Sequence, residues 1–571
     1  MIIDQQAVRS QRKFLPADLK IDSWQSLESF FIDLQSRDLT TFKQLASWLS
    51  DLSELETVVQ EYVGWLYIRM TCDTKDEKLT EAYTFFINEI NPHIEPFSDA
   101  LNKKLDACPL TAQLGAKYAI YLREVKNAIK LFCKENIPLN AELSVMEQKF
   151  GEIAGAMSVT VDGKELTLQQ ASNYLRVPDR QKREEVYHKI VTRRSQDEDE
   201  LNQLFTALVI LRNKIAKNAG FDNYRDYKFS ALNRFDYSVK DCEDFQQSVK
   251  LSVVPLLDEL MANRKREMAV ATLRPWDLEV DANGFPDLKP FKDGSDLIQK
   301  TISCFTEIDP YFGEVIRTLH EMKFMDLDSR MGKAPGGYNY PLYETGVPFI
   351  FMNSSCSLRD LITMVHEGGH AIHSMLTHSL PFIGFKEFPS EVAELASMSM
   401  ELISMEHWHH FFEDENELRR AKKEQLENVI EALPWILCID RFQHWIYLNP
   451  DHTSKERSDF WEQNFSSFSS AITDWSGLEN VRRSIWQKQL HLFEVPFYYI
   501  EYGMAQLGAI AMWKQYREQP AKAIENYKKA LSLGHTVSIP EVYRAAGISF
   551  DFSDQYIREL MLFVKSVYNN L

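Results

Sequence analysis

Apolar residues recur at intervals of three and four along nearly the whole chain, which is the pattern of amphipathic α-helices. In the segment 30–49 the recurring residues are Phe30, Phe31, Leu34, Leu39, Phe42, Leu45 and Leu49. A chain of 571 residues is also long enough to bury a large core. The sequence therefore predicts a large protein of mainly α class.

Three segments interrupt this helical pattern. Around the Asp162-Gly163 pair, the segment 151–170 has the alternation and the tight turn of a small β-hairpin. The segment 272–294 is rich in Pro, Gly and Asp, which predicts a long loop. In 330–356, turn residues surround a short apolar run, and we expect a few short strands there.

These changes of pattern suggest a division of the chain into three consecutive regions. We expect an N-terminal lobe of helical hairpins at 1–140 and a middle helical region at 141–330 that contains the β-hairpin. The remaining region, 331–571, contains the strongest motif of the sequence.

Cysteine usage and the absence of long apolar runs both indicate the cytoplasm as the compartment of the protein. The seven cysteines occur singly, without a CxxC pair: Cys72, Cys108, Cys133, Cys242, Cys304, Cys356 and Cys438. Scattered single cysteines are typical of reduced thiols in a cytoplasmic protein. We see neither the apolar stretch of a signal peptide nor a run of eighteen apolar residues. We therefore expect a cytoplasmic protein without a membrane partner.

The charge balance argues against one further class of partner. The formal net charge is -19 at pH 7, and no basic stripe offsets it. Such a surface repels a phosphate backbone, so we expect no nucleic-acid partner.

The strongest motif is His-Glu-Gly-Gly-His at 366–370. On a helix, His366 and His370 lie one turn apart on one face, so both imidazoles can reach one Zn²⁺. Glu367 is then placed to act as general base toward a water at the metal. Ser357, as a helix N-cap, begins a suitable apolar helix before the motif. The motif therefore predicts a zinc-dependent hydrolase.

A tetrahedral catalytic zinc needs a third protein ligand. The acidic residues Glu387, Glu391, Glu394 and Glu401 share one helical stripe downstream, and spacing alone does not choose among them. His373 is a rival, but seven residues place it about 10.5 Å along the helix axis from the first histidine. A position lining a cleft or a place in the core suits it better.

The sequences HEGGHAIHS at 366–374 and AELASMSME at 393–401 together resemble the M3 metallopeptidases, in particular the oligoendopeptidase F and Pz-peptidase branch. By this resemblance Glu394 is the third zinc ligand, and Glu401 orients a ligand histidine. The resemblance extends to 491–509, HLFEVPFYYIEYGMAQLGA. It implies that Tyr502 and Tyr499 donate hydrogen bonds to the oxyanion and that His491 contacts the bound peptide or the intermediate.

The resemblance also implies a fold and an activity. M3 members are large two-lobed helical zincins with one zinc ion at the bottom of a deep channel and short strands beside the active site. The implied activity is cleavage of internal bonds in short, unstructured oligopeptides. One alternative is an exopeptidase of the same class, either a peptidyl-dipeptidase or a carboxypeptidase. Another is a helical peptide-binding protein without catalysis. The sequence does not indicate an oligomeric state.

Overall fold

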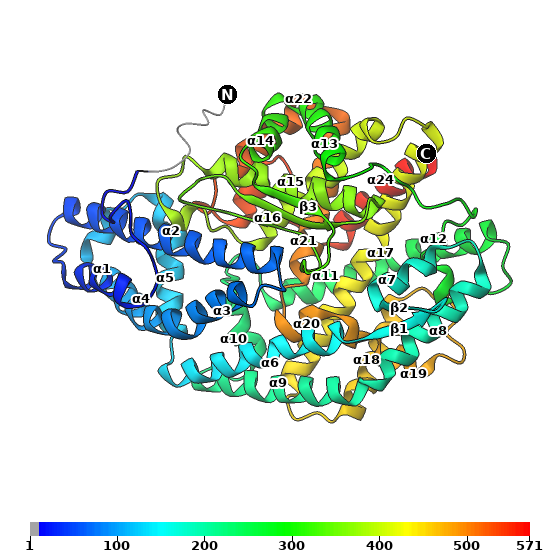
Figure 1. The fold of residues 1–571 in the computed structure, drawn as a ribbon, viewed down its shortest axis with the longest axis horizontal. Coiled ribbons are helices and arrows are strands. Elements are labelled where there is room, and N and C mark those ends of the chain that lie inside the picture. The colour runs from blue at the N-terminus through cyan, green and yellow to red at the C-terminus, as the bar shows by residue number, and fades with distance from the viewer. Residues whose placement is uncertain (1–10) are drawn as a thin grey trace. The chain divides into compact units, whose positions relative to one another are not determined.

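The computed structural model describes residues 11–571, which divide into two compact units (Figure 1). Unit 1 contains the chain up to Lys130, Lys289–Lys422 and Ala505–Phe550. Unit 2 contains Leu131–Leu288, Lys423–Met504 and Asp551–Leu571. Each unit is assembled from three segments, so neither corresponds to one continuous stretch of sequence.

Unit 1 is built mainly from helices. Its α-helices are α1 (Gln25–Ser36), α2 (Phe42–Cys72), α3 (Glu77–Phe85), α4 (Asn91–Asp106), α5 (Ala119–Leu131), α13 (Gly294–Ile308), α14 (Pro310–Glu321), α15 (Leu358–Thr377), α16 (Ser390–Ser404), α22 (Pro520–Leu531) and α23 (Ile539–Ala545). Shorter 3-10 or π segments are η1 (Phe86–Ile90), η2 (Pro109–Gln113), η3 (Ala116–Tyr118), η7 (Ile383–Phe385) and η8 (Met405–His410).

Unit 2 is also helical. Its α-helices are α6 (Ile137–Gly155), α7 (Leu168–Ser172), α8 (Arg180–Gln196), α9 (Glu198–Asn218), α10 (Tyr224–Ala231), α11 (Val239–Ser252), α12 (Val254–Glu267), α18 (Ser454–Phe468), α19 (Glu479–Ser484), α20 (Leu490–Glu494) and α24 (Asp554–Asn570). Its short 3-10 segments are η4 (Lys134–Asn136), η5 (Asn173–Arg176), η6 (Pro275–Asp277) and η9 (Ile485–Lys488). Three helices contain residues of both units: α5, whose last residue Leu131 belongs to unit 2, α17 (Glu415–Leu448) and α21 (Ile500–Glu518). The predicted mainly α class is confirmed.

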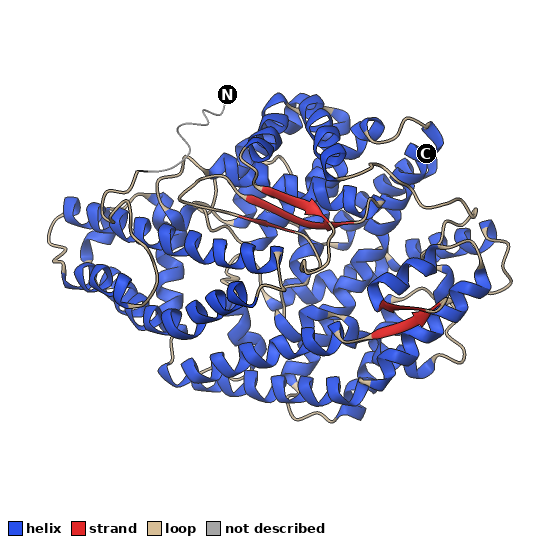
Figure 2. Ribbon diagram, viewed as in Figure 1, coloured by secondary structure: helices blue, strands red, loops and turns tan. Residues whose placement is uncertain are grey.

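Strands occur in two small sheets within residues 11–571 (Figure 2). In unit 2, β1 (Ser158–Val161) and β2 (Lys164–Thr167) pair antiparallel across Asp162 and Gly163, which have φ of 51° and 76°. Two successive positive φ angles match the tight turn that the sequence predicted. The hairpin prediction is therefore confirmed.

The other sheet belongs to unit 1 and has the order β3-β5-β4. Strand β5 (Phe349–Ser354) lies between β3 (Met325–Asp328), which is parallel to it, and β4 (Tyr338–Tyr340), which is antiparallel. The expectation of strands within 330–356 is confirmed for β4 and β5. Strand β3 was not predicted, because its four residues follow a helix directly and are too few to display a period of their own.

One helical segment of the sequence is divided in two. The periodic stretch 30–49 is split by residues 37–41, and α2 begins after Thr41. The Thr41 hydroxyl accepts a hydrogen bond from the backbone N–H of Gln44, and the Gln44 side chain accepts one from the backbone N–H of Thr41. This reciprocal pair starts a new helix although the apolar spacing runs on. The loop expected at 272–294 is confirmed, and η6 is a short 3-10 turn within it.

In unit 1, α15 lies at the centre of the elements that later form the candidate site. It packs against α16, α13, α14 and α22, and also against β4 and β5. Its buried face includes Leu361, Val365 and Ile372, each with no exposed surface. Apolar burial of this extent fixes the helix rigidly, which is the condition for holding side chains in defined positions.

Two whole-chain expectations can be compared with residues 11–571. No helix in this range combines the length and apolar composition that a membrane span requires. No disulfide bond joins any of the seven cysteines, all of which lie in the same range.

Candidate active site

Helix α15 carries the His-Glu-Gly-Gly-His motif. The Ser357 hydroxyl accepts a hydrogen bond from the backbone N–H of Asp360, and the Asp360 carboxylate accepts one in return from the backbone N–H of Ser357. The predicted N-cap is therefore confirmed. Because the helix begins here and continues to Thr377, His366 and His370 lie on the same face, with ring centroids 4.9 Å apart.

The structure brings a third candidate ligand to these histidines. Glu394 on α16 places its Oε2 atom 3.4 Å from Nε2 of His366 and 3.8 Å from Nε2 of His370. Ligand atoms that each lie 2.0–2.1 Å from a tetrahedral Zn²⁺ are about 3.3 Å from one another. Two imidazole nitrogens and a carboxylate oxygen therefore surround a space of the size that Zn²⁺ needs.

Gly369 explains how α16 comes so close to α15. A Cβ atom at this position would lie 2.6 Å from Cα of Ser397 and 2.8 Å from the carbonyl oxygen of Ala396. Backbone atoms cannot move aside as a flexible side chain can. The neighbouring Gly368 faces the Phe305 ring of α13, and a Cβ there would lie 2.7 Å from a ring atom. The two glycines therefore serve close helix packing, Gly369 against a backbone and Gly368 against a side chain.

Two further contacts hold the candidate ligands in place. Nδ1 of His366 lies 2.7 Å from Oε1 of Glu401, which follows Glu394 by seven residues on the same face of α16. This leaves Nε2 of the ring directed at Glu394. The Ser397 hydroxyl donates to Oε2 of Glu394 over 3.2 Å. Outer contacts of this kind set the ring orientation and tautomer of a metal-binding histidine.

The protonation states also suit a metal. Burial lowers the pKa of His370 to about 4, so its ring is neutral near pH 7. Burial raises the pKa of Glu394, but His366 and His370 outweigh it and the net pKa is lowered. Burial lowers the pKa of His366, while Glu394 and Glu401 raise it, to a net value well above the ordinary one. The Glu394 carboxylate lies beside both rings, and this set of nitrogen and oxygen donors fits Zn²⁺.

Glu367 follows His366 on α15 and is 5% exposed. Burial, more than any other influence, raises the pKa of its carboxyl to about 7. Asn339 on β4 donates from its backbone N–H to this carboxylate, which lowers the pKa. The Asn339 side-chain amide also donates to the carbonyl oxygen of Glu367 over 3.5 Å. A carboxyl with a pKa near 7 can both accept and return a proton.

Asn339 was not among the residues predicted from the sequence. It lies in the Tyr-Asn-Tyr of β4, and only the position of this short strand beside α15 reveals its contacts with Glu367. Tyr527 was also missed, although its hydroxyl donates to the carbonyl of Ala396 over 2.8 Å and so fixes α16 from α22. No spacing signal connects residues so distant in sequence.

His373, the rival ligand, is a core residue. It has no exposed surface, and its ring stacks on Phe388 with centroids 3.6 Å apart. Burial lowers its pKa to about 3. Among the other acidic candidates, Glu391 is 2% exposed. Glu387 accepts a hydrogen bond from the Gln60 amide over 2.6 Å.

The remaining predicted site residues lie together in unit 2. The ring of His491, on α20, lies 4.6 Å from the ring of Tyr499 and 5.9 Å from that of Tyr502 at the start of α21. The amide Nε2 of Gln489 lies 2.6 Å from Nδ1 of His491. Burial raises the pKa of Tyr499 to about 12, so its hydroxyl keeps its proton and remains a hydrogen-bond donor.

Comparison with known protein families shows which family the chain belongs to. The model of Peptidase family M3 matches residues 173–562, which is more than half of the chain. The chain belongs to Peptidase family M3. The Peptidase M3 N-terminal domain additionally matches residues 14–132. The histidine motif and the glutamates of α16 both fall within the longer match.

Individual M3 relatives are similar in sequence and in fold. Oligoendopeptidase F from Lactococcus lactis subsp. cremoris is 23% identical over 55% of this chain and 51% of its own. Oligopeptidase PepF from Bacillus subtilis is 24% identical over 52% of this chain and 44% of its own. The chain thus spans about half the length of these curated relatives. The solved structure of Pz peptidase A with an inhibitor has a TM-score of 0.90 and 24% identity, covering 98% of this chain and 99% of its own.

Proposed function

We propose that this M3 protein is a zinc metallopeptidase that hydrolyses internal bonds of short, unstructured peptides. The observation that carries the proposal is the convergence of His366, His370 and Glu394 beside the buried carboxyl of Glu367. The names of the relatives, oligoendopeptidase F and oligopeptidase PepF, support the substrate class.

In the proposed mechanism, His366, His370 and Glu394 hold one zinc ion. Zn²⁺ in such a site supplies Lewis acidity, which lowers the pKa of water and stabilises negative charge on a carbonyl oxygen. Glu367 takes the proton of the attacking water and later returns it to the leaving amine. Because burial raises the pKa of Glu367 to about 7, both transfers cost little near neutral pH.

Other residues of the chain position these groups. Glu401 accepts the Nδ1 proton of His366, which keeps the Nε2 lone pair directed at Glu394. The backbone N–H of Asn339 holds the Glu367 carboxylate. On the M3 resemblance, we assign oxyanion donation to Tyr502 and Tyr499 and peptide contact to His491.

The decisive experiment is hydrolysis of a quenched fluorescent peptide of about ten residues, with mass spectrometry of the fragments. We expect internal cleavage that disappears when a zinc chelator is added and returns when zinc is restored. Removal of one or two residues from an end would replace the endopeptidase proposal with an exopeptidase. Cleavage that a chelator leaves unchanged would contradict the zinc mechanism. Equal cleavage of a folded protein and its denatured form would contradict the restriction to unstructured peptides.

A further inference from the structure

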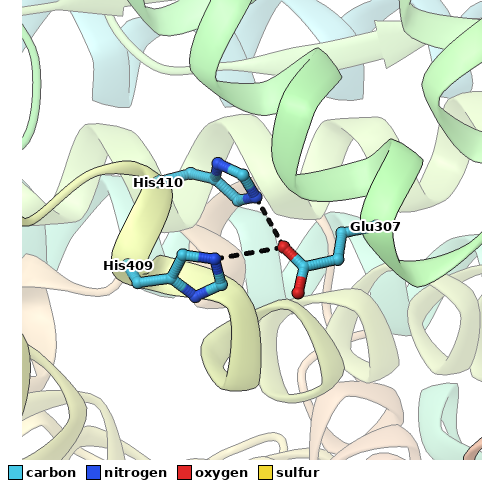
Figure 3. Close-up of side chains that lie close together, drawn as sticks. All are labelled: Glu307, His409 and His410. Atoms are coloured by element: carbon cyan, nitrogen blue, oxygen red, sulfur yellow. Dashed lines mark hydrogen bonds and ion pairs between the residues drawn. The ribbon is translucent and has the colours of Figure 1, made fainter.

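A second group of histidines surrounds one carboxylate in unit 1, away from the residues of the proposed mechanism. Nε2 of His410 lies 2.7 Å from Oε2 of Glu307, and Nε2 of His409 lies 3.1 Å from the same oxygen (Figure 3). The three ligand atoms all lie within 4.8 Å of one another. Figure 3 shows both imidazole rings directed at this carboxylate.

The fold brings these residues together through two neighbouring elements. Glu307 lies in the last turn of α13, and both histidines lie at the end of η8, the 3-10 segment that follows α16. The two elements pack against each other, with Sγ of Cys304 3.8 Å from the carbonyl oxygen of Ser404. Neither Cys304 nor Ser404 has any exposed surface, so the base of the group is rigid.

A third histidine fixes the orientation of the carboxylate. Nδ1 of His407 lies 3.2 Å from Oε1, the other oxygen of Glu307. Nε2 of the same ring lies 2.7 Å from the hydroxyl of Tyr516. With the Tyr516 hydroxyl donating to Nε2, the Nδ1–H of His407 faces Glu307. His407 therefore lies beside Oε1, whereas Oε2 is the oxygen that faces His409 and His410.

The surrounding charges do not compete for this group. Two acidic residues lie close to the group in sequence. Glu406 accepts a hydrogen bond from Nε1 of Trp513 over 2.9 Å and lies 3.5 Å from Arg517, and Asp309 pairs with Lys528 over 2.5 Å. Both are therefore engaged with other partners. Glu307 is left as the one carboxylate of the group, and each imidazole ring directs its Nε2 atom at the same carboxylate oxygen.

We propose that Glu307, His409 and His410 form a second metal site that binds a divalent transition-metal ion such as Zn²⁺. Two imidazole nitrogens and one carboxylate oxygen are donors that suit Zn²⁺ and its neighbours, and not Ca²⁺ or Mg²⁺, which prefer oxygen alone. His407 is a positioning residue of this site, because it holds the oxygen that does not ligate.

The partial exposure of the three ligand side chains determines how the ion is coordinated and how easily it exchanges. The side chains of Glu307 and His409 are 45% and 50% exposed, and that of His410 is 28% exposed. Water can therefore complete the coordination, and the ion exchanges freely with the solvent. Because the ion joins α13 to η8, binding stabilises the folded chain by mass action.

The test is equilibrium dialysis of the metal-stripped full-length protein against buffered free zinc, with bound zinc measured by elemental analysis. We expect the double variant His409→Ala/His410→Ala to bind one ion fewer than the unaltered protein. Glu307→Gln, which keeps the size of the side chain, is expected to remove the same equivalent. His320→Ala on α14 removes another exposed histidine and serves as the matched control, with no change in stoichiometry.

A second readout separates binding from misfolding. Without metal, all variants are expected to unfold at the same temperature, whereas added zinc raises the Tm of the unaltered protein more than that of the double variant. His407→Ala is expected to keep the equivalent but weaken it about tenfold. Equal zinc stoichiometry in the unaltered protein and both ligand variants would overturn the proposal. This comparison does not depend on peptidase activity or on occupancy of the site at His366.

Discussion

Nδ1 of His366 lies 2.7 Å from Oε1 of Glu401, and both residues come from helices that pack against each other at Gly369. The two ring nitrogens of His366 therefore face different residues. Nδ1 faces Glu401, and Nε2 faces Glu394. The ring orientation of the proposed ligand is thereby fixed before any metal arrives.

Replacement of Glu401 with Gln is expected to weaken zinc binding about 10- to 100-fold, because the amide is a poorer acceptor for the Nδ1 proton. Competition with a chromophoric chelator measures this affinity. The exposed Glu387 provides the matched control, and Glu387→Gln is expected to leave the affinity unchanged. Unaltered affinity in Glu401→Gln would show that the His366 contact does not tune the metal.

Glu367→Gln is expected to lower kcat by about 10³-fold or more while the protein still binds one equivalent of zinc at the His366 centre. The amide occupies the same space but cannot take up a proton. Steady-state kinetics with the quenched peptide, combined with elemental analysis, measures both quantities. A variant with near-normal kcat would rule out Glu367 as the general base.

Gly369→Ala is expected to lower the free energy of unfolding by about 2 kcal/mol and to weaken zinc binding. The new Cβ would lie 2.6 Å from Cα of Ser397, so α16 must shift and carry Glu394 with it. Chemical denaturation and chelator competition measure the two effects.

Gly368→Ala is the matched comparison on the same helix. Its Cβ meets the Phe305 side chain, which can rotate, and alanine gains about 1 kcal/mol of helix propensity over glycine. We therefore expect a smaller loss of stability and little change in zinc affinity. If both variants behaved alike, the close backbone approach at Gly369 would not be the feature that positions α16.

His373 is expected to make the stability depend on pH below neutrality. Its pKa is lowered to about 3 in the folded chain, against 6.5 for the ordinary side chain. As the pH falls below 6.5, the unfolded chain takes up a proton that the folded chain does not, so stability is lost. At pH 5 this loss is about 2 kcal/mol.

Chemical denaturation at pH 7 and pH 5 measures this contribution as a difference between proteins. His373→Leu is expected to lose about 2 kcal/mol less than the unaltered protein between the two pH values. The exposed His320→Leu serves as control and is expected to follow the unaltered protein. An identical loss in all three would contradict a buried neutral His373.

The sequence predicted the fold class because apolar spacing is a local property. Hairpin β1–β2 was predictable for the same reason, since Asp162-Gly163 determines its turn. Strand β3 was not, because pairing with β5 depends on contacts outside its own four residues. The break between α1 and α2 was overlooked because the apolar spacing continues through it, although Thr41 and Gln44 carry a readable capping signal.

The residues of the candidate site also fall into two groups, those that local spacing predicts and those that only tertiary contacts reveal. His366, Glu367 and His370 share one helix, so their spacing alone places them together. Spacing left four glutamates open as the third ligand, and the resemblance pointed to Glu394. In the structure Glu394 lies beside both histidines, because Gly369 has no Cβ atom and the backbone of α16 can pack closely against it. Asn339 contacts Glu367 from a strand, and no local sequence pattern predicts such a contact.

The hydrogen bond from Tyr527 to Ala396 has a consequence for biosynthesis. Helices α15 and α16 leave the ribosome long before α22, which covers them, and at about 5–20 residues per second the delay is roughly ten seconds. During that time their apolar faces lack their final cover and are exposed to chaperones. We therefore expect zinc to enter the His366 centre of the finished chain, after translation rather than during it.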